Sequence, residues 1–499
     1  MPGVPRTNRC SGCKRRKIKC DENWPTCGGC ARAKTTCSGP PNPHTFVTHF
    51  PPNQAVEGIP ERSGITNRHG SLMLLQSQRL HGSDSCIGTF RLYSSTLSPG
   101  SNLTTSADRI AARLAAMLTH DAPHDMMFQA GYLKYLPARI SSSPALRDAV
   151  ALMCSAYANF QRGLPANQVL NPTLYGKALR SLGRAIDNRT CITAETVAAT
   201  TIMERVEILF DAGRPFHRAR HARGIDTLTR QRGPPKLDDE FDVQLALENH
   251  AALICQWTVD GGDNFFLRSP WKEFVDRATV SAGGVSEKRK DIYAIGRYYV
   301  YWPCLLQEFK RLNSERDEPT RMAQAERLGR IVSALDFDVR AKGDCLLEKA
   351  YNLGNIKERP DPQTPIGARY DIVCLDSLQL LVSYAMWAAI CNRMLHHLRM
   401  VQGLAPSPSL DKDHRNFCRQ IWMCIPYIQE LGGTTSVLFV APLYLSYEGA
   451  TEELEKEYLF DYIVEVTRKR GRLMENLQDL ERLVLNTARA MAAREELAH

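Results

Sequence analysis

The chain has 499 residues, 43% of them hydrophobic and 23% charged, and a formal net charge of +9. This composition excludes a chain that is disordered throughout, and the length exceeds what one hydrophobic core usually supports, so we expect several domains. The charge is concentrated, because residues 1–40 hold nine Lys and Arg side chains and only two acidic ones. The remaining residues are almost balanced in charge.

The N-terminal sequence MPGVPRTNRC contains no apolar segment of the kind that directs secretion. We therefore expect the 16 cysteines to lie in a reducing compartment, where thiols favour metals over disulfides. The longest nearly uncharged apolar stretch, Leu378 to Cys391, is shorter than the roughly 20 residues that span a bilayer. It predicts a buried helix, and we expect no membrane partner.

The first element, residues 1–39, holds six cysteines in the pattern C-x2-C-x6-C-x6-C-x2-C-x6-C: Cys10, Cys13, Cys20, Cys27, Cys30 and Cys37. The second three repeat the spacing of the first three after a shift of 17 residues. A tetrahedral structural zinc ion takes four ligands, so two ions need eight ligand positions, and two of the six thiolates must bridge. The repeat requires the bridging pair to be related by the same shift, and Cys10 with Cys27 is the most plausible pair.

This choice predicts two zinc sites that share two ligands. The first consists of Cys10, Cys13, Cys20 and Cys27, and the second of Cys10, Cys27, Cys30 and Cys37. Two alternatives stay open. A single zinc ion on the two C-x2-C pairs would leave Cys20 and Cys37 without a role, and three disulfides would need an oxidising compartment.

The segment CKRRKIKCD, Cys13 to Asp21, together with Pro25 just before the fourth cysteine, resembles the fungal zinc binuclear cluster transcription factors. The motif covers fewer than 40 of the 499 residues. The resemblance implies two short helices around two zinc ions, with Cys10 and Cys27 bridging. It also implies that the helix after the second cysteine enters the major groove of double-stranded DNA, where such domains typically recognise a CGG triplet.

The same resemblance places Arg16 and Lys17 where members of the family read base edges. We expect the other basic residues of the head to contact phosphates, which position a domain without reading sequence: Lys14, Arg15, Lys19, Arg32 and Lys34. Because only one face of the cluster can meet DNA, the charge concentrates in the first half of the repeat. The alternatives for this charge are a solvated basic face and a nuclear import signal. Ile18 is expected to pack under the first helix.

The next elements are a linker and a helical region. Residues 40–105 are rich in turn-forming residues without sustained periodicity, which predicts a flexible, largely irregular linker. From residue 106 to residue 499 a hydrophobic spacing of 3.6 residues recurs and predicts a large all-α domain. The resemblance of the head implies that this is the regulatory domain of a transcription factor. The clearest predicted helices are residues 106–120, 144–160, 194–210 and 376–398.

The helical region contains two candidate segments. Phe216–Pro234 places His217 and His221 four residues apart among arginines, without a nearby acidic companion, so we expect a structural or surface role. It resembles, more weakly than the cysteine motif, a segment in the regulatory region of the same family. Glu448–Val466 mixes acidic and apolar residues as activation segments do, but its continuing periodicity favours a final amphipathic helix of the bundle.

One apolar series can either dock on the bundle or pair with a second chain: Ile463, Val466, Leu473, Leu477, Leu480 and Val484. Members of the family often dimerise through a coiled coil just after the cluster. Residues 40–70 contain no heptads, so we expect any homodimer to form through the helical domain, at Tyr458–Val484.

The resemblance of the head implies a nuclear, sequence-specific transcription factor that acts on RNA polymerase II genes and contacts the transcription machinery. Such factors often govern pathway genes, including those of secondary metabolism. The sequence contains no nucleophile elbow, zinc-protease motif, P-loop or dinucleotide-binding motif, so we do not expect an enzyme. The alternative is a helical small-molecule receptor or unrecognised enzyme that the zinc head tethers to DNA.

Overall fold

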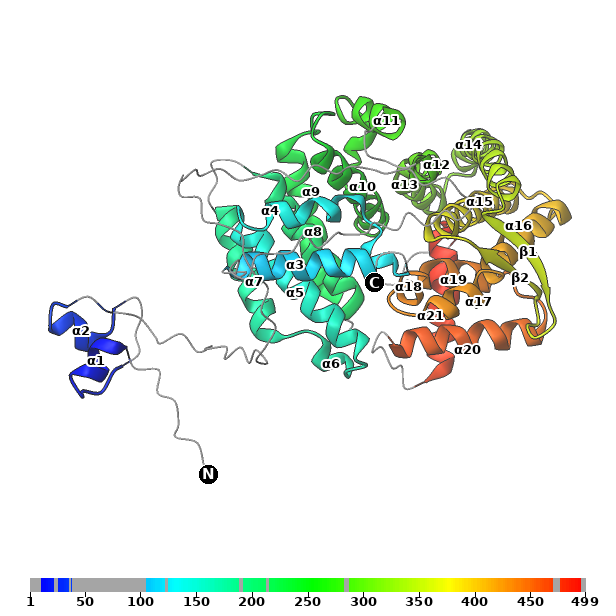
Figure 1. The fold of residues 1–499 in the computed structure, drawn as a ribbon. Helices are drawn as coiled ribbons and strands as arrows, with labels where there is room; N and C mark the ends of the chain where they lie inside the picture. Colours follow the sequence, from blue (N-terminus) through cyan, green and yellow to red (C-terminus); the bar gives the residue numbers. More distant parts are fainter. Residues whose placement is uncertain are drawn as a thin grey trace, which may run out of the picture. The chain divides into compact units, whose positions relative to one another are not determined.

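The computed structural model describes residues 10–21, 26–35, 37, 105–121, 124–187, 192–211, 215–281, 287–469 and 476–494 (Figure 1). The chain divides into two compact units, Met1–Tyr93 and Ser94–His499. The predicted linker, residues 40–105, lies outside the described residues except for Thr105. Within the described ranges, no helix combines the length and the apolar composition that crossing a membrane requires.

The first unit contains two short helices, α1 (Ser11–Arg15) and α2 (Gly28–Arg32). The N–H groups in the first turn of a helix have no acceptor inside the helix. In both short helices, a side chain from outside the helix accepts a hydrogen bond from one of these N–H groups. At α1, the Cys13 N–H donates to the sulfur of Cys10 at 3.2 Å. At α2, the Gly28 N–H donates to both carboxylate oxygens of Asp21, at 2.9 and 3.1 Å.

The second unit begins with helices that share one hydrophobic core: α3 (Ser106–His120), η1 (Met126–Phe128), η2 (Gly131–Tyr135), α4 (Leu136–Arg139), α5 (Pro144–Gln161), α6 (Ala166–Val169), α7 (Pro172–Asp187) and α8 (Ala194–Phe210). A capping box starts α3, because Thr105 and Asp108 accept from each other's backbone N–H groups. Pro144 opens α5 after the cap Ser143, at a position where its missing N–H costs nothing. The helices predicted at residues 106–120, 144–160 and 194–210 are confirmed.

A second core is formed by the following helices: α9 (Pro215–Arg232), α10 (Glu240–Asp260), η3 (Phe265–Leu267), α11 (Trp271–Ser281), α12 (Glu287–Gly296), η4 (Arg297–Tyr301), α13 (Trp302–Ser314), α14 (Glu318–Asn352), α15 (Leu375–Val401), α16 (Pro408–Trp422), α17 (Ile425–Leu431), α19 (Val440–Tyr447), α20 (Glu453–Lys469) and α21 (Leu477–Met491). The short helix α18 (Thr435–Leu438) packs on the first core instead. The two longest, α14 and α15, pack against each other. Trp387 of α15 is fully buried and stacks on Tyr299, with ring centroids 4.9 Å apart. The prediction of a buried helix at Leu378–Cys391 is confirmed.

The all-α prediction missed one antiparallel hairpin, formed by β1 (Ile356–Asp361) and β2 (Gly367–Ile372). Alternate residues of β2 are buried, namely Ala368, Tyr370 and Ile372. The Tyr370 N–H also donates to the Met423 carbonyl at 2.9 Å, which ties the hairpin to the helices. The intervening sequence PQTPI has no Asn-Gly or Asp-Gly turn, and Pro360 lies within β1, so the usual sequence signals for a hairpin are missing.

Asp125, just before η1, connects the two cores. Its carboxylate is buried and accepts the N–H and the hydroxyl of Thr434, the former at 3.0 Å. It also accepts the Met127 N–H at 3.0 Å and the Tyr157 hydroxyl at 3.3 Å. Since Val437 of α18 packs into the first core, residues more than 300 positions apart in sequence meet here.

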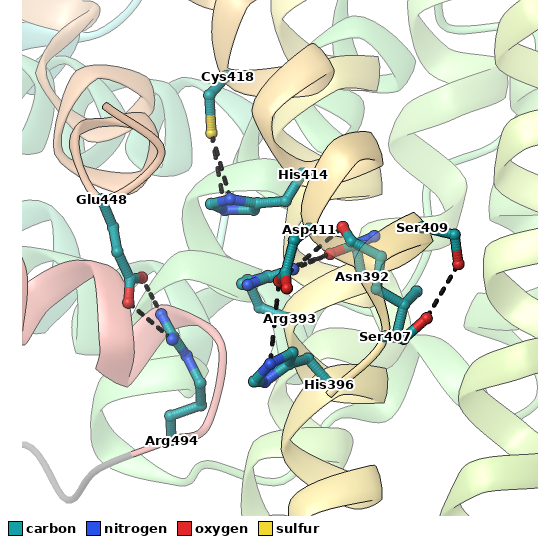
Figure 2. A network of polar contacts seen from close by, with 11 residues as sticks. Asn392, Arg393, His396, Ser407, Ser409, Asp411, His414, Cys418, Glu448 and Arg494 are labelled. Atoms are coloured by element: carbon teal, nitrogen blue, oxygen red, sulfur yellow. Dashed lines mark hydrogen bonds and ion pairs between the residues drawn. The ribbon is translucent and has the colours of Figure 1, made fainter. Parts of the chain in front are cut away.

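A polar network lies among α15, α16, α19 and the end of the chain (Figure 2). Arg393 is buried on α15 and donates to Asn392 at 2.8 Å and to Asp411 at 3.1 Å. Arg494 donates to Glu448 at 2.7 Å. This ion pair attaches the segment after α21 to the helix that ends just before Glu448.

Candidate metal centre and nucleic-acid interface

The six cysteines of the head converge into two groups of four sulfur atoms. The first group is Cys10, Cys13, Cys20 and Cys27, and the second is Cys10, Cys27, Cys30 and Cys37. Within each group all sulfurs lie within 4.8 Å of one another. The sulfurs of Cys10 and Cys27 are 3.7 Å apart and belong to both groups. All six residues are buried except Cys37, which is half-buried.

The two halves of the repeat build this arrangement in the same way. Cys10 and Cys27 immediately precede α1 and α2, so each C-x2-C pair turns its sulfurs inward around the start of a helix. Gly12 and Gly29, also related by the shift of 17, lie against sulfurs of the opposite half. A Cβ atom on Gly12 would lie 3.2 Å from the Cys30 sulfur, and one on Gly29 would lie 3.0 Å from the Cys13 sulfur.

Two residues after the end of each short helix lies a lysine with a left-handed backbone, Lys17 (φ 54°) after α1 and Lys34 (φ 48°) after α2. The next N–H then reaches back five residues: Ile18 donates to the Cys13 carbonyl at 3.2 Å, and Thr35 to that of Cys30 at 3.1 Å. This turn reverses the chain so that the third cysteine of each half can return to the cluster. An L-residue with a side chain pays roughly 1–2 kcal/mol for this conformation, which glycine adopts freely.

Arg16 contacts the cluster itself. Its Nη2 donates to the Cys30 sulfur at 3.2 Å, and its Nε donates to the Gly12 carbonyl at 3.2 Å. Burial raises the pKa of the Cys13 thiol, so these sulfurs need cations to persist as thiolates. Two Zn²⁺ ions with six thiolates carry a formal charge of about −2, which a guanidinium beside a sulfur partly offsets.

The predicted DNA-contacting residues lie on the surface of the head, with one exception. Lys14, Arg15, Lys17, Lys19, Arg32 and Lys34 are exposed. Arg16 is half-buried because of its contact with Cys30. Ile18 is 39% exposed, and its Cδ1 lies 3.3 Å from where a Cβ on Gly29 would be, so it packs partly on the second half.

Three structural residues of the head escaped the sequence reasoning. Gly12 and Gly29 carried a usable signal, because glycine occupies the same position in both copies of the repeat. Asp21 carried none. It lies seven residues before Gly28, outside the one-turn spacing at which an acid beside a helix start is recognised as a cap.

The candidates of the helical region have structural contacts. His221 lies 2.8 Å from the buried carboxylate of Glu207, whereas the side chain of His217 lies outside the described residues. The acidic and apolar segment Glu448–Val466 contains most of α20, whose inner face packs on the bundle. This is the amphipathic helix that the periodicity favoured.

The apolar series that could dock on the bundle or pair with a second chain packs largely within the chain. Its buried members in the described residues are Ile463, Val466, Leu480 and Val484, and all belong to the second core. Leu473 lies outside the described residues, and Leu477 is exposed. Of the two alternatives, these four residues therefore follow the first and dock on the bundle, whereas a homodimer through Tyr458–Val484 stays a prediction.

Comparison with known proteins identifies the cysteine-rich head. Residues 9–44 match the family of the fungal Zn(2)-Cys(6) binuclear cluster domain. This match contains all six cysteines and all seven basic residues discussed above. No curated protein and no solved structure matches the chain.

Proposed function

Because residues 9–44 are a fungal Zn(2)-Cys(6) binuclear cluster domain, we propose that the chain is a nuclear regulator of RNA polymerase II genes. Such a domain binds two zinc ions and DNA. Residues 106–499 act as its regulatory domain and contact the transcription machinery. Control of a pathway gene cluster, such as one for secondary metabolism, fits this role. The observation that carries the proposal is the double group of sulfurs beside a strongly basic short helix.

We assign the zinc ligands from the two groups of sulfurs. One ion takes Cys10, Cys13, Cys20 and Cys27, and the other takes Cys10, Cys27, Cys30 and Cys37. Two observations support the assignment: each group has the four ligands that a closed structural zinc site requires, and the shared pair is related by the repeat.

The first half of the head faces the DNA in this proposal. Lys17 reads guanine in the major groove of a CGG-type half-site, and its exposed side chain in the turn that follows α1 supports this role. The exposed residues Lys14, Arg15, Lys19, Arg32 and Lys34 contact phosphates. Arg16, expected from the family resemblance to read bases, has its guanidinium on the Cys30 sulfur and holds the cluster in position.

The test separates base reading from phosphate contact. Lys17→Gly removes the side chain but keeps the left-handed turn, so the backbone is not a confounding factor. This variant should lose roughly 1–3 kcal/mol on the selected site and little on scrambled DNA. Lys14→Ala should weaken binding to both duplexes alike and reduce the salt dependence by about one unit of slope.

Lys34→Gly is the matched control, because Lys34 occupies the equivalent turn in the second half. It should behave as Lys14→Ala does. The preferred site is first selected from random duplexes with the full chain, and titrations at several salt concentrations then compare the three variants. Equal losses for Lys17→Gly on both duplexes would assign the reading role to another residue, and selection of no common site would contradict the proposed function.

A further inference from the structure

The outer face of α14 carries a stripe that faces away from the molecule. The inner face of this helix packs on the second core through Leu328, Val332, Leu335, Val339 and Leu346. On the opposite side, exposed residues follow one another at steps of three and four: Arg327, Arg330, Ala334, Phe337, Ala341, Asp344 and Glu348. We call these seven residues the α14 outer stripe.

Phe337 lies at the middle of this stripe and is 72% exposed, more than any other large apolar side chain in the described residues. A single exposed apolar residue is ordinary and identifies no partner by itself. Its neighbours in the stripe are the small residues Ala334 and Ala341, which allow a second helix to approach to about 8–10 Å. The ring can then lie over the small side chains of that helix.

The charges of the stripe are divided between its two ends. Arg327 and Arg330 lie on the N-terminal side of Phe337, and Asp344 and Glu348 lie on the C-terminal side. In an antiparallel pair of these helices, the basic end of each copy faces the acidic end of the other. A parallel pair would bring like charges together, so the charge order selects the antiparallel arrangement.

Two of these charges already have partners within the chain. Asp344 accepts the Tyr384 hydroxyl at 2.6 Å, and Arg327 donates to Glu308. Arg330 and Glu348 form no ion pair with any described residue and are exposed. They are the two charges whose pairing a second copy would complete.

We propose that the α14 outer stripe is a homodimer interface, occupied by the same stripe of a second copy in antiparallel orientation. A twofold axis that passes between Phe337 and Ala341 relates the copies, so that Arg330 of each copy lies opposite Glu348 of the other. Such an interface is self-complementary by construction. The seven residues span about 32 Å of helix, since an α-helix rises about 1.5 Å per residue. Ile463, Val466, Leu480 and Val484 cannot serve instead, because they are buried in the second core of the same chain.

The test is sedimentation velocity of the full chain over a range of concentrations, without DNA. The wild-type chain should dimerise, and Phe337→Asp should raise the dissociation constant roughly thirtyfold or more, as the loss of a central aromatic residue does at other interfaces. The matched control is Leu454→Asp, which changes a 67% exposed leucine on α20 and should leave the dimer intact. Circular dichroism checks that both variants stay folded.

The orientation is tested by charge exchange. Arg330→Glu and Glu348→Arg should each weaken self-association, whereas an equimolar mixture of the two variants should dimerise, because each end then pairs opposite charges. A wild-type chain that stays monomeric at every concentration overturns the proposal. The proposal is also overturned if Phe337→Asp leaves the dimer unchanged or if Leu454→Asp disrupts it as well. If the mixture of Arg330→Glu and Glu348→Arg does not dimerise, the antiparallel pairing is ruled out.

Discussion

Cys10 and Cys13 differ in the number of sulfur groups that contain them. The Cys10 sulfur belongs to both groups of four, whereas the Cys13 sulfur belongs only to the first. The same contrast holds for Cys27 and Cys30 in the second half. A structural zinc site needs its full set of four ligands. Loss of Cys10 or Cys27 therefore affects both proposed zinc sites, whereas loss of Cys13 or Cys30 directly affects one.

We predict that the full chain binds two zinc ions and that Cys10→Ser loses both of them. Cys13→Ser should lose one ion directly and keep a weaker second site. The measurement is elemental analysis of the purified chain after gel filtration, with Cys345→Ser as the control, since Cys345 is an exposed cysteine of the helical unit. One zinc ion per wild-type chain would contradict the shared ligands.

At the scale of the element, α14 contains two glycines with opposite surroundings. A Cβ atom on Gly343 would lie 2.1 Å from the ring of Tyr384 on α15, whereas one on Gly329 would have no atom within 4 Å. Glycine weakens a helix by roughly 1 kcal/mol relative to alanine. Gly343 is therefore kept for the close approach of Tyr384, and Gly329 has no such reason in the described structure.

This contrast predicts opposite signs for the same substitution on one helix. Gly329→Ala should stabilise the helical unit by up to about 1 kcal/mol. Gly343→Ala should destabilise it by roughly 1–3 kcal/mol, because the Tyr384 ring must move and its hydroxyl contact with Asp344 is strained. Urea denaturation of both variants measures the difference, and a stabilising Gly343→Ala would show that the ring has room to shift.

The elements also show which features the sequence could predict. The long helices α5, α8 and α15 follow from their long apolar segments, and α8 and the middle of α15 are buried on almost every face. The two groups of sulfurs agree with the spacing of the cysteines, since the repeat is local and nearly symmetric. The hairpin β1–β2 is local but lacks the usual turn signals, and its bond to the helices, from the Tyr370 N–H to the Met423 carbonyl, reaches far along the chain. The contact of Arg16 with Cys30 crosses the cluster, and periodicity carries no information about either feature.

At the scale of the whole helical unit, two buried histidines make stability depend on pH. Burial lowers the pKa of His250, which packs on the Phe266 ring, to about 4. Burial, with the positive charges of Arg393 and Arg494 in the network of Figure 2, lowers the pKa of His414 well below its usual value. In the folded state, burial deprives the charged form of each histidine of hydration, which disfavours protonation. In the unfolded chain both histidines are in water and take up a proton without this cost.

Because the pKa values are lowered in the folded state, the helical unit loses stability as the pH falls. The stability is fully present above the unfolded pKa near 6.5 and falls as the pH drops toward 4, because the unfolded state binds more protons. His250 should contribute a loss of roughly 2 kcal/mol by pH 5. Urea denaturation at pH 7.5 and pH 5 should show a smaller loss for His250→Gln than for wild type, and an unchanged loss for the exposed control His120→Gln.

The last prediction is that the buried carboxylate of Asp125 makes the two cores unfold together. Its two carboxylate oxygens accept four hydrogen bonds, from Met127, Tyr157 and both donors of Thr434. Asp125→Asn replaces one carboxylate oxygen by an NH2 group. This group faces hydrogen-bond donors, so buried N–H and O–H groups of both cores lose an acceptor. The free energy of unfolding should fall by roughly 1.5–3 kcal/mol, the range for hydrogen bonds to charged groups. Hydrogen exchange should rise first in η1 and α18, where the cores meet, and later elsewhere.

The exposed Asp461→Asn on α20 is the control and should change stability by less than about 0.5 kcal/mol. If the two variants unfold alike, the cores are joined by their apolar contacts, such as that of Val437, and the buried carboxylate is not what couples them.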